Sequence, residues 1–579
     1  QGTGRITYDD DTPPDECSSC EGTRLNPVAL AVTLNGETIA SLNDMSVIEA
    51  ADYFAKMKLD GRAALIARDI MSELQARLQF LKDVGLGYLQ MSRAAPTLSG
   101  GEAQRIRLAS QLGSNLRGVC YILDEPTIGL HTRDNQRLLQ TLLALQAQGN
   151  TVVVVEHDED TIRAAQHVID IGPGAGQRGG YVVATGTPKA IERHKDSLTG
   201  KMLKQPLSHP LREQWRNVNP RRKATPVLRV EGATRNNLRR VNVSLPLGAL
   251  VAVTGVSGSG KSSLIRGVVQ DNLDMLIAAR NARKRKMPAP VDCRSIDGWE
   301  SIKRVLEVDQ TPIGKTPRSC PATYVGFWDE IRKLFAQTTE ARIRGYTASR
   351  FSFNTAEGRC PECDGQGMRR IEMNFLPDVR VPCEACGGMR FAPDTLTIRY
   401  REKSIGDILL MSVEEAIPFF EAHPKIHHPL TLLNDVGLGY LTLGQPSPTL
   451  SGGEAQRIKL VTELAKAKPT LEPGTQCVTD NPNHTLYVLD EPTIGLHMAD
   501  VEKLIRVLHR LVDAGHSVFI VEHNLDIIAE ADWIVDLGPE GGTEGGRIVA
   551  QGNPIQITEK SNKSLTGAAL SKILLVESD

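Results

Sequence analysis

The sequence contains no apolar run of the roughly 18 residues that a membrane-spanning helix needs, and its strongest candidates, such as TVVVV from Thr151, are typical of buried strands. Aromatic residues make up 4% of the chain, and 67 Lys and Arg residues nearly balance 69 Asp and Glu residues. These absences exclude a membrane channel or permease within the sequence, and they restrict any nucleic-acid binding to local basic patches. The polar, acidic start has no secretory signal.

The cysteines, 10 in number, fall into pairs and singles. Two Cys-x-x-Cys pairs sit among small turn residues, in RCPECDGQG and VPCEACGG, and without a signal peptide such pairs indicate a metal site rather than disulfides. Four thiolates around Zn²⁺ make a closed structural site with no position for a catalytic water. The alternative is four unrelated buried thiols. The predicted ligands are Cys360, Cys363, Cys383 and Cys386, with Cys17 and Cys20 as a possible half-site.

The chain repeats itself, unequally. VGLGYL occurs at Val84 and Val436, and PTLSGGEAQRI recurs at the same spacing of 352 residues. LDEPTIGLH occurs at Leu123 and Leu489, and the VEH motif recurs at that same spacing of 366 residues. The second copy therefore carries 14 additional residues between these motifs, in a stretch rich in Pro and Asn that predicts a surface loop.

The first copy lacks what the second copy has at its start. Its counterpart of the loop GVSGSGKSS would precede Gln1, and Cys17 and Cys20 align with Cys383 and Cys386, so we expect the chain to be a fragment that begins inside the first copy. We predict an α/β chain with an incomplete first copy (1–210), a linker (211–226) and a complete second copy (227–579). The predicted motifs are, in the first copy, 17–20 (zinc half-module), 98–102 (signature), 119–125 (Walker B) and 157 (His switch), and in the second copy 255–263 (Walker A), 350–392 (zinc module), 450–454 (signature), 486–491 (Walker B) and 523 (His switch).

The glycine-rich loop of the second copy follows an apolar strand, ALVAVTG, and precedes an apolar helix start, which is the context of a phosphate-binding P-loop. Glycines let backbone N–H groups surround phosphate oxygens, and the helix N-terminus adds positive potential. Lys261 is predicted to reach the β and γ phosphates and Ser262 to ligate Mg²⁺. A glycine-rich turn that arose by chance is the alternative. The predicted phosphate-binding residues are Gly255, Ser257, Gly258, Ser259, Gly260, Lys261, Ser262 and Ser263.

Two carboxylates end the apolar run TLYVLDEP, and a histidine ends SVFIVEH. Asp490 suits the Mg²⁺ shell, Glu491 suits the base that orients or deprotonates the attacking water, and His523 could contact the γ phosphate, although a lone histidine is more often structural. The LSGGE segment has no lysine, so its Ser-Gly-Gly at a helix start predicts a second kind of anion receptor. Two receptors serve one γ phosphate best from opposite sides, which predicts two copies that face each other head to tail with ATP between them.

Together these motifs resemble the ABC-type ATPases, and more narrowly the UvrA family of damage-sensing subunits in bacterial nucleotide excision repair. The resemblance is carried by GVSGSGKSSL, VDQTPIGKTPRSCPATYVGFWDEIR, RFSFNTAEGRCPECDGQG, VPCEACGGMRF and both copies of PTLSGGEAQRI and LDEPTIGLH. A zinc module between the P-loop and the signature is a specific feature of that family. The resemblance covers nearly the whole chain but about the last two-thirds of the length expected for the family.

The resemblance implies which residues share a site. In the family, the P-loop of one half meets the signature of the other half, and Gln310 in VDQTP matches the Q-loop that senses Mg²⁺ and the γ phosphate. The complete site would combine Lys261, Ser262, Gln310, Asp490, Glu491 and His523 with Ser99, Gly100 and Gly101. The second site would combine Asp124, Glu125 and His157 with Ser451, Gly452 and Gly453, without a P-loop of its own.

The resemblance also implies a function. It predicts a cytoplasmic ATPase of the SOS response that binds damaged double-stranded DNA as a homodimer and loads a UvrB-like partner through a region upstream of this sequence. Near the zinc module, Arg359, Arg369, Arg370 and Arg380 are candidates for phosphate contacts, with an ordinary solvated face as the alternative. The 14-residue insertion leaves open a divergent paralogue in drug resistance or sequestration. A transporter-type ATPase would carry no zinc module, and an inactive structural protein would not need Lys261, Asp490 and Glu491.

Overall fold

The computed structural model of the chain describes residues 5–6, 15–98, 100–112, 117–222, 225–284, 286–371, 373, 379–466 and 481–574. By its internal contacts the chain divides into two units, each of which is described by itself. Unit 1 contains residues 1–156, 255–260 and 538–546, and unit 2 contains residues 157–254, 261–537 and 547–579. None of the described helices combines the length and the apolar character that a membrane crossing demands.

The second copy is built on a six-stranded sheet with the order β13-β18-β19-β11-β20-β21. Strands β13, β18, β19 and β11 pair in parallel, and every residue of β11 and β19 is buried. Parallel strands covered on both faces read as continuous apolar runs, which is why LVAVTG and SVFIV form central strands. The strands are β11 (Leu250–Gly255), β13 (Arg304–Val308), β18 (Thr485–Asp490), β19 (Ser517–Val521), β20 (Trp533–Gly538) and β21 (Arg547–Gly552).

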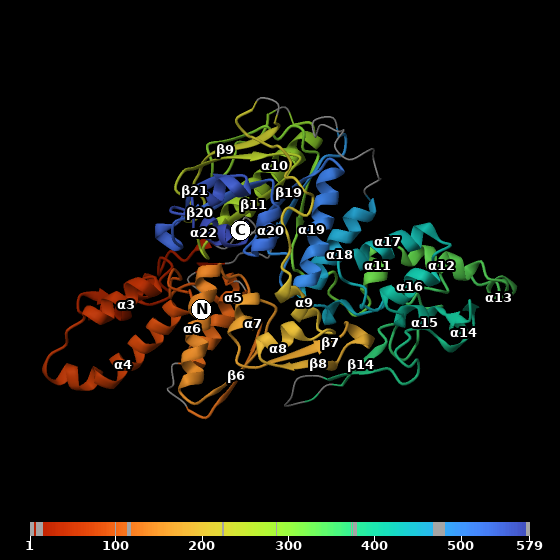
Figure 1. Cartoon of the computed structure of the whole chain (residues 1–579), viewed down its shortest axis with the longest axis horizontal. Coiled ribbons are helices and arrows are strands. Elements are labelled where there is room, and N and C mark those ends of the chain that lie inside the picture. Colours follow the sequence, from red (N-terminus) through yellow and green to blue (C-terminus); the bar gives the residue numbers. More distant parts are fainter. Residues whose placement is uncertain are drawn as a thin grey trace. The chain divides into compact units, whose positions relative to one another are not determined.

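Helices cover this sheet, and a separate group of helices carries the zinc and signature segments (Figure 1). A three-stranded antiparallel sheet, β10-β9-β12, completes the start of the second copy. The remaining elements of the second copy are β9 (Val227–Ala233), β10 (Val241–Pro246), the π-helix η3 (Ser263–Gln270), α10 (Asp271–Asn281), β12 (Ser295–Asp297), α11 (Pro321–Val325), α12 (Trp328–Ala336), α13 (Thr339–Ile343), β14 (Met368–Ile371), β15 (Val379–Pro382), α14 (Pro393–Leu396), β16 (Arg399–Tyr400), β17 (Lys403–Ser404), α15 (Ile405–Leu410), α16 (Val413–Phe419), α17 (Pro424–Asp435), α18 (Gly452–Lys466), α19 (Met498–Asp513), α20 (Leu525–Glu530), α21 (Pro554–Thr558) and α22 (Leu565–Leu574).

The first copy repeats the later part of this arrangement. Its strands β5 and β6 pair in parallel, as their counterparts β18 and β19 do, and β7 pairs with β8. Its elements are β1 (Arg5–Ile6), β2 (Asp15–Glu16), α1 (Pro27–Leu30), β3 (Thr33–Leu34), β4 (Glu37–Thr38), α2 (Ile39–Asp44), α3 (Val47–Lys56), α4 (Gly61–Asp83), α5 (Gly100–Leu112), β5 (Cys120–Asp124), α6 (Thr132–Ala147), β6 (Thr151–Val155), α7 (Glu159–Ala164), β7 (Val168–Gly172), β8 (Tyr181–Gly186), α8 (Pro188–Arg193) and α9 (Leu198–Lys204).

The same sequence pattern is buried in one copy and exposed in the other. Ile122 on β5 is 75% exposed, whereas Val488 at the matching position of β18 is 1% exposed. In the second copy, Val488 belongs to a core with strand residues Val251 and Val253 of β11 and with residues of η3 such as Leu264. Among the described residues, β5 and β6 of the first copy form a sheet of two strands, and the side chain of Ile122 is left exposed.

The α/β class, the repeated strand pairs and an inserted four-cysteine cluster are as predicted. The predicted surface loop lies mostly in residues 467–480, outside the described residues. The structure also locates a second difference in length: the aligned Cys-x-x-Cys pairs are 366 residues apart and the VGLGYL segments 352, and between these motifs the first copy has the longer helix, α4 with 23 residues against 12 in its counterpart α17. The predicted boundaries at residues 210 and 226 remain a prediction.

Two valines at matching positions test how much burial by neighbouring elements contributes to the free energy of unfolding. Val521 at the end of β19 is 1% exposed and Val155 at the end of β6 is 50% exposed. We expect Val521→Ala to lower the free energy of unfolding by about 2 kcal/mol, because buried methyl groups leave water and a cavity remains. The matched variant Val155→Ala should cost less than about 0.5 kcal/mol, as exposed substitutions do. Chemical denaturation of both variants measures the difference, and equal losses would contradict the exposed face of β6.

Candidate nucleotide site and zinc module

The P-loop lies where the sequence predicts it, at the carboxyl end of β11. Gly258 and Gly260 adopt φ angles of +74° and +102°, in the left-handed region that favours glycine. The Gly258 carbonyl accepts the Gly542 N–H at 3.0 Å, so the loop is held by its own copy. Among the described residues, no hydrogen-bond partner reaches the buried Ser259 Oγ. A loop of this shape in front of a helix start fits phosphate oxygens.

A pair of cations surrounds the carboxylate at the end of β18. Lys261 is 6% exposed, and the Arg266 guanidinium from η3 contacts Asp490 with Nη1 3.1 Å from Oδ2 and also pairs with Glu307. Burial raises the pKa of Asp490, while Arg266 and Lys261 oppose that rise. The carboxylate is thus a suitable Mg²⁺ ligand beside the P-loop. The sequence analysis missed Arg266, although its position on the helix face after the P-loop was a usable signal.

The catalytic candidates Glu491 and His523 lie together at the ends of β18 and β19. Their Oε1 and Nε2 atoms are 3.8 Å apart, and the Glu491 N–H donates to the Val521 carbonyl at 2.9 Å. Glu491 has a φ of +45°, which is uncommon for a residue with a side chain and typical of functional sites. The matching Glu125 of the first copy has a φ of +44° and donates to Val155 in the same way.

Glu522 is a buried carboxylate beside the candidate catalytic residues that the sequence analysis did not single out. It is 1% exposed and accepts the backbone N–H groups of Thr493, His523 and Asn524, together with the Thr493 hydroxyl. Burial raises the pKa of Glu522, and these hydrogen bonds oppose the rise. The carboxylate therefore joins the segment after Glu491 to the backbone of His523. The position of Glu522 in the VEH motif, between strand β19 and His523, could have identified this residue from the sequence.

The signature of the second copy lies beside its own Q-loop. On α18, the Gln456 amide donates to the carbonyls of Val308 at 2.8 Å and Asp490 at 3.0 Å. A Cβ atom added to Gly452 would approach Gln310 Oε1 to 3.3 Å, and one added to Gly453 would clash with the Ile494 carbonyl at 2.5 Å. Glycine is thus required at Gly453 for close packing.

The predicted pairing of Lys261 with Ser99, Gly100 and Gly101 remains a prediction. Ser99 lies outside the described residues, and Gly100 and Gly101 begin α5 in unit 1, whereas Lys261 belongs to unit 2. Unit 1 itself does join part of the P-loop to the first copy. There, Ser257 Oγ donates to the Gly129 carbonyl at 3.1 Å.

Tyr88 is the second contact of this kind within unit 1. A Cβ atom on Gly258 would come within 2.6 Å of the Tyr88 ring, and the Tyr88 hydroxyl donates to Glu102 Oε1 of the signature helix at 2.6 Å. Tyr440 occupies the matching position in the second copy and donates to Glu454. The repeated VGLGYL segment contained this signal, but the motif gave no reason to assign the tyrosine a role. Tyr88 thus links the P-loop backbone at Gly258 to Glu102, the glutamate of the first LSGGE segment.

In the first copy, Asp124 ends β5 and Glu125 follows it, as predicted. The predicted switch His157 lies in unit 2, where its ring stands edge-on to His497 with 6.3 Å between centroids. The His497 Nε2 atom is 3.1 Å from Thr199 Oγ1. His157 thus approaches the segment that follows the second-copy carboxylates.

The cysteine cluster has the geometry of a closed metal site. Among the described residues, the Sγ atoms of Cys360, Cys363, Cys383 and Cys386 form the group that could hold an ion, all within 4.8 Å of one another. The Cys363 and Cys386 sulfurs are 3.8 Å apart, the separation expected of a tetrahedron with Zn–S bonds of about 2.3 Å. Burial raises the pKa of Cys386 to about 12, so a cation is needed to hold the thiolate. The donor set fits zinc.

Arg390 connects this zinc module to the segment before the signature. It is 3% exposed, it donates from Nη2 to the Gly444 carbonyl at 2.6 Å, and its own carbonyl accepts the Cys360 N–H at 2.9 Å. Of the predicted phosphate-contacting arginines, Arg359 pairs with Asp364 and Arg369 with Glu362. The module is therefore fixed to the signature region by a buried cation.

On the zinc hairpin, Arg370 of β14 lies directly opposite Arg380 of β15, and both are exposed. Two exposed arginines at opposite positions of a hairpin place two positive charges close together, in a local basic patch of the kind that binds phosphate groups. A groove runs beside the hairpin and includes both arginines together with Glu362 and Glu384.

Comparison with known proteins places these features in a family. No family model matches the chain. It is 51% identical over 558 residues to the UvrABC system protein A of Lactiplantibacillus plantarum and to that of Bacillus subtilis, covering 96% of this chain and 56% of each relative. The crystal structure of UvrA2 from Deinococcus radiodurans matches with a TM-score of 0.83 and 43% identity, over 97% of this chain and 66% of that chain. The chain belongs to the UvrA family. It spans about half the length of the curated UvrA relatives that it matches.

For the zinc module, we expect Cys363→Ser to lower the zinc content of this UvrA chain from about one ion to none. Structural zinc contributes on the order of 10 kcal/mol to the folding of its own small domain, so the module should also become sensitive to proteolysis. Elemental analysis of the purified protein measures the metal, and Cys293→Ser is the matched control. We also predict that Cys17 and Cys20, which are half of a site, hold no stable zinc in this chain. A second stoichiometric zinc in the unmodified chain would contradict that prediction.

Proposed function

We propose that this chain supplies the nucleotide-hydrolysing part of a damage-recognition ATPase of nucleotide excision repair. The carrying observation is that Lys261 and Asp490 interact and that Glu491 lies 3.8 Å from His523, in a UvrA family chain. In this proposal ATP and Mg²⁺ bind at the P-loop, with the first-copy signature on the other side of the nucleotide. The substrate is damaged double-stranded DNA, bound by a homodimer that loads a UvrB-like partner. A cytoplasmic location and a place in the SOS response belong to the same proposal.

The residues divide the chemistry among them. Bound MgATP supplies the phosphoanhydride bond to be cleaved. The Lys261 ammonium is placed to neutralise phosphate charge, and Asp490 to hold the metal. Glu491 is placed to orient or deprotonate the attacking water, and His523 lies 3.8 Å from Glu491, so the two side chains can act on the same water or phosphate oxygen.

DNA binding is supported by the paired arginines of the zinc hairpin. Arg370 and Arg380 face each other on exposed strands, and Arg390 ties the same module to the segment before LSGGE. A change in the signature on ATP binding can thus reach the hairpin through packed, buried groups. The alternative of a paralogue in drug resistance or sequestration is not favoured, because the curated relatives named above are all called UvrABC system protein A.

The base assignment predicts that Glu491→Gln keeps ATP binding and lowers turnover by about 10²- to 10⁴-fold, the range for loss of a positioned base. Steady-state hydrolysis and equilibrium binding of a fluorescent ATP analogue measure the two quantities. The control is Glu502→Gln on α19, where the carboxylate only pairs with Arg506. Unchanged turnover in Glu491→Gln would remove that residue from the role.

The hairpin assignment predicts that the double variant Arg370→Gln and Arg380→Gln binds duplex DNA more weakly. Each phosphate contact contributes about 0.9 to the slope of log affinity against log salt, so the slope should fall by about 2. Mobility-shift titrations at several salt concentrations, on lesion-bearing and undamaged duplexes, measure it. The control is Arg344→Gln, which changes an exposed arginine at the C-terminal end of α13. An unchanged salt slope would place the DNA contact elsewhere.

A further inference from the structure

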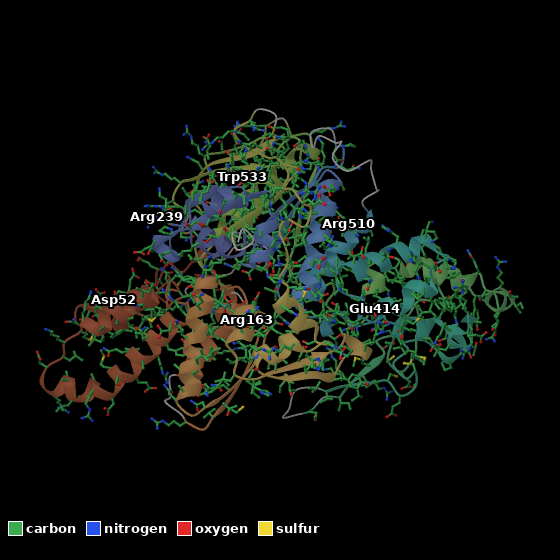
Figure 2. All side chains as sticks on the ribbon, in the orientation of Figure 1. Asp52, Arg163, Arg239, Glu414, Arg510 and Trp533 are labelled. Carbon is green, nitrogen blue, oxygen red and sulfur yellow. The ribbon has the colours of Figure 1, made fainter. Side chains whose placement is uncertain are left out.

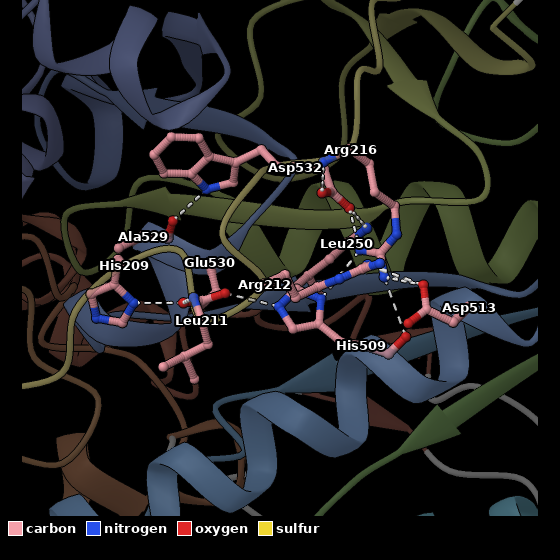
Figure 3. Close-up of polar contacts among 11 residues, drawn as sticks. His209, Leu211, Arg212, Arg216, Leu250, His509, Asp513, Ala529, Glu530 and Asp532 are labelled. Carbon is pink, nitrogen blue, oxygen red and sulfur yellow. Dashed lines mark hydrogen bonds and ion pairs between the residues drawn. The ribbon is translucent and has the colours of Figure 1, made fainter. Parts of the chain in front are cut away.

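A cluster of buried charges fixes the connection between the two copies to the second copy. We call residues 209–216 the strap. The side chain of His209 is 0% exposed, with Nδ1 2.7 Å from Glu530 Oε1 (Figure 3). Its Nε2 atom is 3.0 Å from Asp526 Oδ1. A carboxylate only accepts hydrogen bonds, so both ring nitrogens donate and the ring is an imidazolium. The strap is therefore held by a buried cation between the two ends of α20.

The far end of the strap makes a second set of bonds. Trp215 Nε1–H donates to the Ala529 carbonyl at 2.8 Å. The Arg216 backbone N–H and its Nη1 each donate to a carboxylate oxygen of Asp532 at 2.9 Å, and Nη2 donates to Asp513 at 2.7 Å. Asp532 is 1% exposed, so its charge depends on this arginine. Figure 3 shows these groups from the strap, α19 and the start of β20 meeting at one place.

The elements that the strap holds are those that carry the nucleotide site. Helix α20 is capped by Asn524, the residue after His523, whose side chain accepts the Ile527 N–H at 3.2 Å. Asp532 Oδ2 also accepts the Leu250 N–H at 2.9 Å, at the start of the strand that ends in the P-loop. A shift of the strap is thus transmitted over short, buried contacts to both sides of the site.

The first copy lacks this cluster. Its residues at the matching positions are Ala164 for Glu530, Gln166 for Asp532, Leu143 for His509 and Ala147 for Asp513. The one acidic counterpart is Asp160, which matches Asp526 and is exposed. The matching helix α7 instead ends near Arg163, which is labelled in Figure 2. Arg163 pairs with Glu159 and Glu192. Buried charges destabilise a fold unless they are paired, so the second copy carries these groups as partners of the strap.

We propose that the strap positions the catalytic histidine: His209 and Arg216 hold α20 and the start of β20, and so keep His523 beside Glu491. This inference rests on the proposed ATPase function. His209 contacts no reacting atom and is a positioning residue, which acts through Asp526, Glu530 and the helix that follows His523. Because the strap is the covalent continuation of the first copy, displacement of that copy acts directly on the helix behind His523.

The charge state of His209 sets the pH range over which it stabilises the strap. Burial opposes protonation of the ring, but hydrogen bonds and charges from Asp526 and Glu530 outweigh it and raise the pKa of His209 to about 9. The other charged groups around the cluster are His509 and Asp513 of α19, Asp532, Arg212 and Arg216. A raised pKa means that the stabilisation is complete below about pH 6.5, the ordinary histidine value, and is lost as pH rises through about 9.

The test compares Asp526→Asn with its counterpart Asp160→Asn in the full chain. In Asp526→Asn we expect kcat for ATP to fall about tenfold while ADP affinity is unchanged, because a displaced His523 affects the γ phosphate and not the rest of the nucleotide. The decline of kcat at high pH should shift toward neutral pH, since one carboxylate that raises the pKa of His209 is gone. Asp160→Asn should behave as the unmodified chain.

Two readouts do not depend on turnover. Histidine NMR should show one resonance titrating near pH 9 that disappears in His209→Gln, and hydrogen exchange of residues 523–530 should accelerate about tenfold in both Asp526→Asn and His209→Gln. His209→Lys, which restores a cation between the two carboxylates, should recover part of kcat and of the exchange protection. Each variant is compared at equal folded fraction.

Unchanged exchange at residues 523–530, or a loss of kcat that follows the melting temperature with no shift of the pH profile, would overturn the proposal. If the unmodified chain hydrolyses no ATP, the proposed function fails by that result alone. The NMR titration and the exchange data then still decide whether the strap holds α20.

Discussion

The parallel pairing of β18 with β19 sets the main constraint on this protein, because it places four ionisable side chains at one edge of an apolar sheet. Asp490, Glu491, Glu522 and His523 follow directly from strands whose other residues are buried. Charge in such a place must be compensated. Lys261 and Arg266 provide cations for Asp490, and backbone N–H groups and Thr493 provide donors for Glu522. The P-loop, the following π-helix and the histidine segment are thus held together by the groups that the chemistry also needs.

The repeats and their motifs could be predicted from sequence, because the chemistry of a P-loop or of a four-thiolate site is specified by residues close together in the chain. The Cys360 to Cys386 cluster and the Glu491–His523 pair fall in this class. The strap could not be found this way, since His209 and its partner Glu530 are 321 residues apart and the linker contains no motif that points to them. Tyr88 was visible as a repeated residue, yet its contact with Gly258 depends on how the two segments fold against each other.

The unequal lengths illustrate a different limit. A change in motif spacing shows that residues have been added but not which element holds them: the spacing falls from 366 residues at the Cys-x-x-Cys pairs to 352 at VGLGYL, yet only the structure shows that the first copy has a longer helix there, α4. Burial is likewise a property of neighbours and not of a strand alone. Val155 and Val521 have the same type and register, but only the second has β11 beside its strand. A sequence pattern can therefore identify a central strand without showing what covers it.

The two copies share the backbone of the hydrolytic segment and differ in what holds it. Glu125 and Glu491 adopt nearly the same left-handed φ, with the same hydrogen bond to the neighbouring strand. The buried cluster of the strap exists only behind the second of them among the described residues. Because the side chains of His209, Glu530 and Asp532 are buried and Arg216 is largely covered, removal of one member leaves another charge unpaired, so the cluster tends to form or break as a whole. The strap is attached by the chain itself to one copy and packs against the helix that follows the histidine of the other, so it is a continuous physical connection between them.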